Sequence, residues 1–92
     1  MAHLIVHHKV ENFAKWKPFF DDHASYRMEN GSLGSKVFQS TNDPNDVFIL
    51  LEWDNFINAS RFIQSDQTKS VMKEAGVVGI PSIYFVEEMT KA

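Results

Sequence analysis

The sequence predicts an α+β domain whose elements follow the order strand, helix, strand, strand, helix, strand. Two observations lead to this prediction. Apolar residues recur at helical spacing in residues 13–28 and 56–75, whereas the segments around them are short runs rich in β-branched and aromatic residues, typical of strands. The loop at residues 41–46 consists of turn-forming residues and separates two such runs, which indicates a hairpin.

The first half of the chain is expected to form one strand and one long helix. Residues 4–9 have the pattern of a strand, and Asn12 is placed to cap the helix that follows. This helix should run to residue 29 or 30, where Asn30-Gly31 provides a left-handed stop. Pro18 has no amide hydrogen and lies inside the helical pattern. It should therefore bend the helix or force a restart near Lys17.

The second half is expected to form the hairpin, a helix in two pieces and a last strand. The hairpin joins residues 36–40 to residues 47–53. Asp54 or Asn55 caps a helix with an apolar face made by Phe56, Ala59, Phe62 and Ile63. Residues 65–66 indicate a break and a second cap, and residues 82–87 form the last strand.

This order is that of a ferredoxin-like βαββαβ plait, in which a four-stranded antiparallel sheet carries its helices on one face. In a monomer the other face should be polar. Residues 47–51, however, read Val-Phe-Ile-Leu-Leu, and alternate side chains of a strand point to opposite faces. Large exposed apolar patches are rare on monomers, so we expect a homodimer that joins the two sheets. The alternative is a single sheet with a few exposed apolar residues.

Composition and charge exclude several classes of protein. The 92 residues are enough for one domain, and the formal net charge of −3 comes without any basic block. Nucleic acid and anionic membranes are therefore not expected as partners. There is no cysteine, which fits a reducing compartment. The N-terminus does not resemble a signal peptide, and no run approaches the roughly 18 apolar residues of a membrane span. The expected location is the cytoplasm.

A histidine and an arginine lie on the apolar side of the first predicted helix. At about 100° per residue, His23 and Arg27 fall one turn apart, within the same arc as Phe13, Trp16, Phe19, Phe20, Ala24 and Tyr26. A buried guanidinium needs hydrogen-bonding partners, because an unpaired buried charge is costly. Arg27 is therefore expected either to pair with an acid, Glu52, Glu87 or Glu88, or to face a cavity that holds a ligand. For His23 the alternative to a ligand contact is a backbone carbonyl.

Several stretches along nearly the whole chain carry a family resemblance. They are residues 8–18, His23-Ala24-Ser25-Tyr26-Arg27, Val37-Phe38, Asp43-Pro44-Asn45, Leu51-Glu52-Trp53 and Gly76-Val77-Val78-Gly79. The chain resembles small bacterial and archaeal proteins of the dimeric α/β-barrel superfamily, which are similar to antibiotic-biosynthesis monooxygenase domains. This resemblance implies a homodimer and a cavity between helices and sheet in each subunit, lined by His23 and Arg27. It selects no activity, because the superfamily includes cofactor-free monooxygenases, haem-degrading enzymes, polyketide cyclases, muconolactone isomerase-like enzymes and regulator ligand domains.

Four aromatic residues are expected to contact a ligand: Trp16, Phe20, Trp53 and Tyr84. Aromatic side chains at helical or strand spacing also serve simply as core, and buried Trp and Tyr need a polar partner. Trp53 and Glu52 point to opposite faces of their strand. The sequence does not decide which face meets the helices, so either residue remains open as the neighbour of Arg27.

No metal ion or cofactor is expected. His7 and His8 point to opposite faces of a strand, and His3 and His7 lie about 13 Å apart along it. The loop at residues 42–46 lacks the glycine and the distal glutamate of a calcium loop. There is no glycine-rich phosphate loop, no serine or cysteine nucleophile motif and no motif for haem.

The sequence therefore indicates a small apolar or aromatic ligand with an anionic end, bound near His23 and Arg27. The first hypothesis is an enzyme, either a cofactor-free monooxygenase or a cyclase or isomerase, that acts on an aromatic or polyketide-like compound. His23 would be the base, and Arg27 would stabilise the developing oxyanion. The second hypothesis is a non-catalytic ligand-binding or sensing module. The third is a structural dimer whose cavity is filled by its own side chains.

Overall fold

The structure is a computed structural model that describes residues 2–91. The elements in chain order are β1 (Ala2–Val10), α1 (Phe13–Asp22), α2 (Ala24–Glu29), β2 (Ser32–Gln39), β3 (Asp46–Trp53), α3 (Phe56–Gln64), α4 (Asp66–Glu74) and β4 (Val77–Glu87). The sheet has the order β2-β3-β1-β4, and every neighbouring pair is antiparallel. The α+β class and the ferredoxin-like plait predicted from the sequence are confirmed. None of the helices in residues 2–91 is long and apolar enough to cross a membrane.

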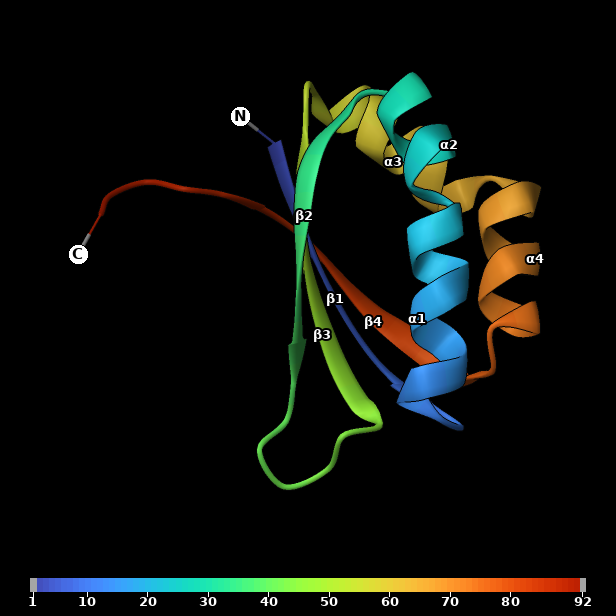
Figure 1. The fold of residues 1–92 in the computed structure, drawn as a ribbon. Helices are drawn as coiled ribbons and strands as arrows, with labels where there is room; N and C mark the ends of the chain where they lie inside the picture. The colour runs from blue at the N-terminus through green and yellow to red at the C-terminus, as the bar shows by residue number, and fades with distance from the viewer. Residues whose placement is uncertain (1, 92) are drawn as a thin grey trace.

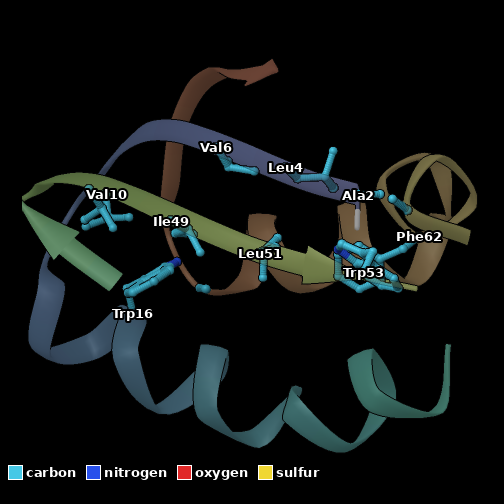
Figure 2. Close-up of a cluster of buried hydrophobic side chains, with 12 residues drawn as sticks. Ala2, Leu4, Val6, Val10, Trp16, Ile49, Leu51, Trp53 and Phe62 are labelled. Carbon is cyan, nitrogen blue, oxygen red and sulfur yellow. The ribbon is translucent and has the colours of Figure 1, made fainter. Parts of the chain in front are cut away.

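All four helices cover the same face of the sheet, and no helix or strand of residues 2–91 covers the other face (Figure 1). The covered face takes the even-numbered residues of β1 and the odd-numbered residues of β3. The core therefore comprises Ala2, Leu4, Val6, Val10, Val47, Ile49, Leu51 and Trp53 from the sheet and Trp16, Ala59, Phe62 and Ala75 from the helical side. In Figure 2, Ile49, Leu51 and Trp53 point from β3 toward the helices. Burial of such side chains contributes about 1.5–3 kcal/mol each.

Polar side chains define where the helices begin. Asn12 Oδ1 accepts a hydrogen bond from the Lys15 amide at 3.2 Å, and Asn55 Oδ1 accepts one from the Asn58 amide at 2.8 Å. Ser65 caps α4, because its hydroxyl accepts a bond from the Thr68 amide at 3.1 Å. Each cap satisfies an amide that has no partner inside its own helix, as the sequence predicted.

The expected restart near Lys17 is wrong. Helix α1 begins at Phe13 and continues through Pro18 to Asp22, and the interruption comes at His23. Backbone bonding spans this joint, because the His23 amide donates to the Phe19 carbonyl and the Arg27 amide donates to the His23 carbonyl, both at 3.1 Å. α2 therefore follows directly on α1 and ends before Gly31, whose φ of +114° is the expected left-handed stop.

Two strands begin four or five residues earlier than expected. β2 begins at Ser32 instead of Lys36, and β4 begins at Val77 instead of Ser82. In both cases the early part of the strand contains a register shift at a glycine, Gly34 in β2 and Gly79 in β4. A bulge lets pairing continue past residues that break the alternating pattern, so pattern alone places the start of the strand too late.

Candidate functional site

A cavity of about 60 Å³ lies between the helices and the covered face of the sheet. Its wall combines side chains from β1, β3 and all four helices. Most are apolar, and the polar members are His8, His23, Arg27 and Thr68. The Thr68 hydroxyl already bonds to the Ser65 hydroxyl at 2.7 Å. The chemistry available to a ligand therefore depends on the two histidines and the arginine.

Arg27 is buried, and residues 2–91 give it no anionic partner. Only 5% of the residue is exposed, and its Nη1 donates to the Phe20 carbonyl at 2.8 Å. Its Cζ lies 3.8 Å from the centroid of the Phe20 ring, a cation–π contact. Burial lowers the pKa of Arg27 below its ordinary value, and Asp21 partly opposes this shift. An arginine nevertheless remains charged in proteins, so the cavity contains a cation.

The expected ion pair with Glu52, Glu87 or Glu88 is absent, since no carboxylate among residues 2–91 lies within 4.0 Å of the Arg27 guanidinium. Glu52 of β3 is the strand partner of His3 of β1, and its Oε1 lies 3.6 Å from His3 Nε2. It therefore points away from the helices, whereas Trp53 lies on the covered face. The Asp21 carboxylate is bound by another cation, because Lys17 Nζ donates hydrogen bonds to Oδ1 at 2.6 Å and to Oδ2 at 2.8 Å.

His23 occupies the joint between α1 and α2. Its ring stacks on Tyr26, with centroids 4.6 Å apart and planes 13° from parallel. Nε2 is buried and finds no hydrogen-bond partner in the described part of the chain. Burial and the charge of Arg27 lower the pKa of His23. The imidazole is therefore neutral at pH 7, and its buried nitrogen can exchange a hydrogen bond with a ligand.

His8 also lines the cavity, although from the sequence it was a candidate only for metal binding. It is 4% exposed, and its ring meets Trp16 edge to face at 5.6 Å and 88°. Burial, assisted by His7, lowers the pKa of His8 from 6.5 to about 4. The alternation of β1 places His8 on the same face as Leu4 and Val6. The alternation of residues along β1 could therefore have identified His8 as buried, but only once the covered face of the sheet is known.

The four aromatic residues expected at the ligand site are divided by the fold. Trp16 and Phe20 line the cavity and stack on each other at 5.0 Å. Trp53 is fully buried against Phe62 at 4.9 Å, away from the cavity wall. Tyr84 pairs with Ile5 and is 55% exposed on the uncovered face of the sheet. Trp53 therefore serves the core, and Tyr84 lies on the opposite side of the sheet from the cavity.

A surface groove of about 420 Å³ adjoins the cavity. Ile63 of α3 and Met72 of α4 belong to both walls. Lys69 and Lys73 of α4 also line the groove, together with Gly79, Ile80, Pro81 and Ile83 of β4. Residues 2–91 contain no group of three His, Asp or Glu side chains that could hold a metal ion.

Comparison with solved structures gives matches along almost the entire chain. A protein of Bordetella bronchiseptica assigned as an antibiotic biosynthesis monooxygenase has a TM-score of 0.81 and 16% identity, over 97% of both chains. The chain shares the fold of this protein. A mutant of SnoaB, a cofactor-independent oxygenase of Streptomyces nogalater, has a TM-score of 0.78 and 10% identity, over 98% of this chain and 94% of SnoaB. A Caulobacter crescentus protein with the same assignment has a TM-score of 0.75 and 17% identity, over 97% of this chain and 90% of that protein.

No protein-family model and no curated protein matches the sequence. At identities of 10–17% the structural matches establish the fold. The expected likeness to antibiotic biosynthesis monooxygenases is confirmed at that level. Function has to be argued from the site itself.

Proposed function

We propose that this protein binds a small, partly apolar molecule with an anionic group and oxidises it as a cofactor-free monooxygenase. The observation that carries the proposal is the buried guanidinium of Arg27, which faces the cavity with no carboxylate beside it in residues 2–91. A buried cation is costly without a counter-charge. A ligand carboxylate or enolate supplies that charge and matches the planar donor fork of arginine.

His23 is the base in this proposal. Its pKa is lowered, so it is neutral at pH 7 and free to accept a proton at its buried Nε2. It takes the proton of a phenol or enol, and Arg27 stabilises the resulting oxyanion. The substrate anion gives two electrons to dioxygen, forms a C–O bond at the carbon that was the CH₂ group of the keto form, and takes back the proton from His23 to give a hydroperoxide. Cleavage of the O–O bond then transfers two more electrons: the carbon keeps one oxygen as a carbonyl, and the other oxygen leaves as water with that proton and the last hydrogen of the carbon. SnoaB, described as a cofactor-independent oxygenase, supports this reaction class through its shared fold.

The size of the cavity limits how such a ligand binds. An apolar cavity that accommodates benzene measures about 150 Å³, whereas this one measures about 60 Å³. An aromatic ligand must therefore displace part of the wall. Met72 is the side chain best suited to move, because methionine is flexible and Met72 separates the cavity from the groove. The body of the ligand would then extend into the groove past Lys69 and Lys73, whose charges favour an anion.

A homodimer is also part of the proposal. The uncovered face of the sheet carries Ile5, Phe38, Phe48, Leu50 and Tyr84, and Phe38 and Tyr84 are more than half exposed. A second copy of the sheet would bury this apolar surface. The cavity lies on the other side of the sheet, so dimerisation would leave Arg27 and His23 accessible from the groove.

The experiment is a thermal-stabilisation screen of aromatic acids, followed by dioxygen uptake with each compound that binds. A ligand at 100 times its dissociation constant stabilises the folded protein by about 2.7 kcal/mol. Binding with dioxygen consumption supports the monooxygenase. Binding without turnover supports a ligand-binding or sensing module. If no aromatic acid binds, ligand binding at Arg27 is contradicted and the structural dimer is favoured.

A further inference from the structure

His8 has no role in the function proposed above, yet its ring contains two polar atoms that the fold leaves without hydrogen bonds. Neither Nδ1 nor Nε2 has a hydrogen-bond partner within residues 2–91, and both atoms are buried. A buried polar group without a partner is destabilising, and such groups are rare in native proteins. The ring lines the cavity, so a molecule in the cavity can supply the missing bonds.

A second, independent feature singles out the same position. Across β1 and β4, His7 pairs with Ser82 and Lys9 pairs with Val78. The single residue His8 is therefore opposed by Gly79, Ile80 and Pro81, which form a bulge. Gly79 adopts a φ of +74°, and Pro81 has no amide to give to the ladder. Bulges are over-represented beside active sites.

This bulge connects His8 to the route proposed for the ligand. Gly79, Ile80 and Pro81 line the surface groove, and Ile80 is 95% exposed. The groove and the cavity share Ile63 and Met72. A molecule that enters from the groove past Met72 reaches the cavity in which His8 and Arg27 are both wall residues.

The imidazole of His8 is neutral at physiological pH, because burial lowers its pKa to about 4. A neutral imidazole has one N–H donor and one acceptor nitrogen. A hydroxyl can accept from the N–H or donate to the other nitrogen, and a carbonyl can accept from the N–H. A neutral ring does not offset the cost of burying a second carboxylate, so an uncharged group fits it better. Arg27 is positively charged, so it binds an anionic group more strongly than an uncharged one.

We propose that His8 contacts the ligand by hydrogen bonds to an uncharged hydroxyl or carbonyl oxygen, while Arg27 binds the anionic group of the same molecule. This inference rests on the proposed function and narrows the ligand to hydroxy- or keto-substituted organic acids. A ligand with only an acidic group leaves the ring nitrogens of His8 unpartnered.

The test compares benzoate with 2-, 3- and 4-hydroxybenzoate by isothermal titration calorimetry at millimolar concentration. The variants are His8→Leu, which removes the ring nitrogens, and His8→Gln, which retains a donor and an acceptor. His3→Leu is the matched control, because His3 lies on the same strand and its Nδ1 is also buried and unpartnered, but it points to the uncovered face.

The wild-type protein should bind at least one hydroxybenzoate about tenfold more tightly than benzoate, which corresponds to about one hydrogen bond. His8→Leu should abolish this ratio without weakening benzoate, whereas His3→Leu should retain it and His8→Gln should retain part of it. A ratio of one in the wild type, or an unchanged ratio in His8→Leu, overturns the role of His8 and leaves the proposed function standing. Failure of all four acids to bind overturns this inference, whereas the proposed function fails only if the whole screen of aromatic acids finds no ligand.

A measurement on the wild-type protein covers the case in which His8→Leu does not fold. The ¹⁵N chemical shifts of the His8 ring should change more with the preferred hydroxybenzoate than with benzoate, because only the former gives the ring a hydrogen-bonding partner. Equal shifts with both acids overturn the assignment.

Discussion

Replacement of Arg27 by methionine separates a ligand-binding arginine from a structural one. Methionine retains the unbranched apolar stem but removes the charge. The loss comprises the bond to the Phe20 carbonyl, about 1.5–3 kcal/mol for a charged donor, and the contact with the Phe20 ring, about 0.5–2 kcal/mol. The gain is the relief of burying an ion, several kcal/mol. These terms nearly cancel, so we expect the free energy of unfolding to change by only about 1 kcal/mol.

Ligand binding should respond differently. If Arg27 holds an anionic group, Arg27→Met should weaken the binding of an aromatic acid by about 1.5–3 kcal/mol, the value of a hydrogen bond to a charged group. Urea denaturation measures the first quantity, and calorimetric titration measures the second. Arg61→Met is a suitable control, because Arg61 is also a helical arginine but is exposed on α3 and lines neither the cavity nor the groove.

Two results would refute this reasoning. A loss of about 3–5 kcal/mol of stability is the cost of breaking a buried ion pair, and it would mean that Arg27 has an acidic partner in solution. Equal affinities of wild type and Arg27→Met for every acid that binds would reduce the guanidinium to a structural element.

The remaining predictions concern the two cavity histidines and the sheet. His8→Leu should raise the free energy of unfolding by about 1–3 kcal/mol in urea at pH 7, since it removes an unpartnered buried polar group; a less stable variant would show that the ring is satisfied in solution. Because the folded-state pKa of His8 is about 4, below the ordinary 6.5, wild-type stability should fall as the pH falls from 6.5 to 4. That fall should be smaller in His8→Leu. His23→Ala should lower the turnover number more than the affinity for any oxidised substrate, and a turnover number equal to that of the wild type would exclude a catalytic base at His23. The wild-type protein should sediment at about twice the chain mass at micromolar concentration, and Leu50→Asp should sediment as a monomer; a monomeric wild type contradicts the dimer.

Local chemistry made much of this fold predictable. The hairpin between β2 and β3 depends on a turn-rich loop between two apolar runs, and the caps at Asn12, Asn55 and Ser65 depend on side chains within three residues of the amides they bind. Such interactions are encoded in short segments, so they can be recognised without knowledge of distant parts of the chain. The order of elements then restricted the topology to a few choices.

Errors arose where a long-range interaction outweighs the local pattern. The sequence predicted either a bend at Pro18 or a restart near Lys17, and the restart is wrong: Trp16 packs in the core on the first half of a helix that continues through Pro18. The start of β4 was placed too late, because pairing with β1 continues across the bulge at Gly79. Neither outcome can be deduced from the segment alone.

The sequence by itself determined that His23 and Arg27 share the apolar arc of a helix, because helical periodicity depends only on spacing. Only the tertiary structure decided which face of the sheet meets that helix. The choice places Trp53 in the core, Glu52 and Tyr84 on the far side, and His8 in the wall of the cavity. It also keeps Glu52, one of the partners predicted for Arg27, away from the guanidinium. The physical reason is that a strand with apolar residues on both sides has two faces of similar hydrophobicity, so its pattern carries no information about which face the helices cover.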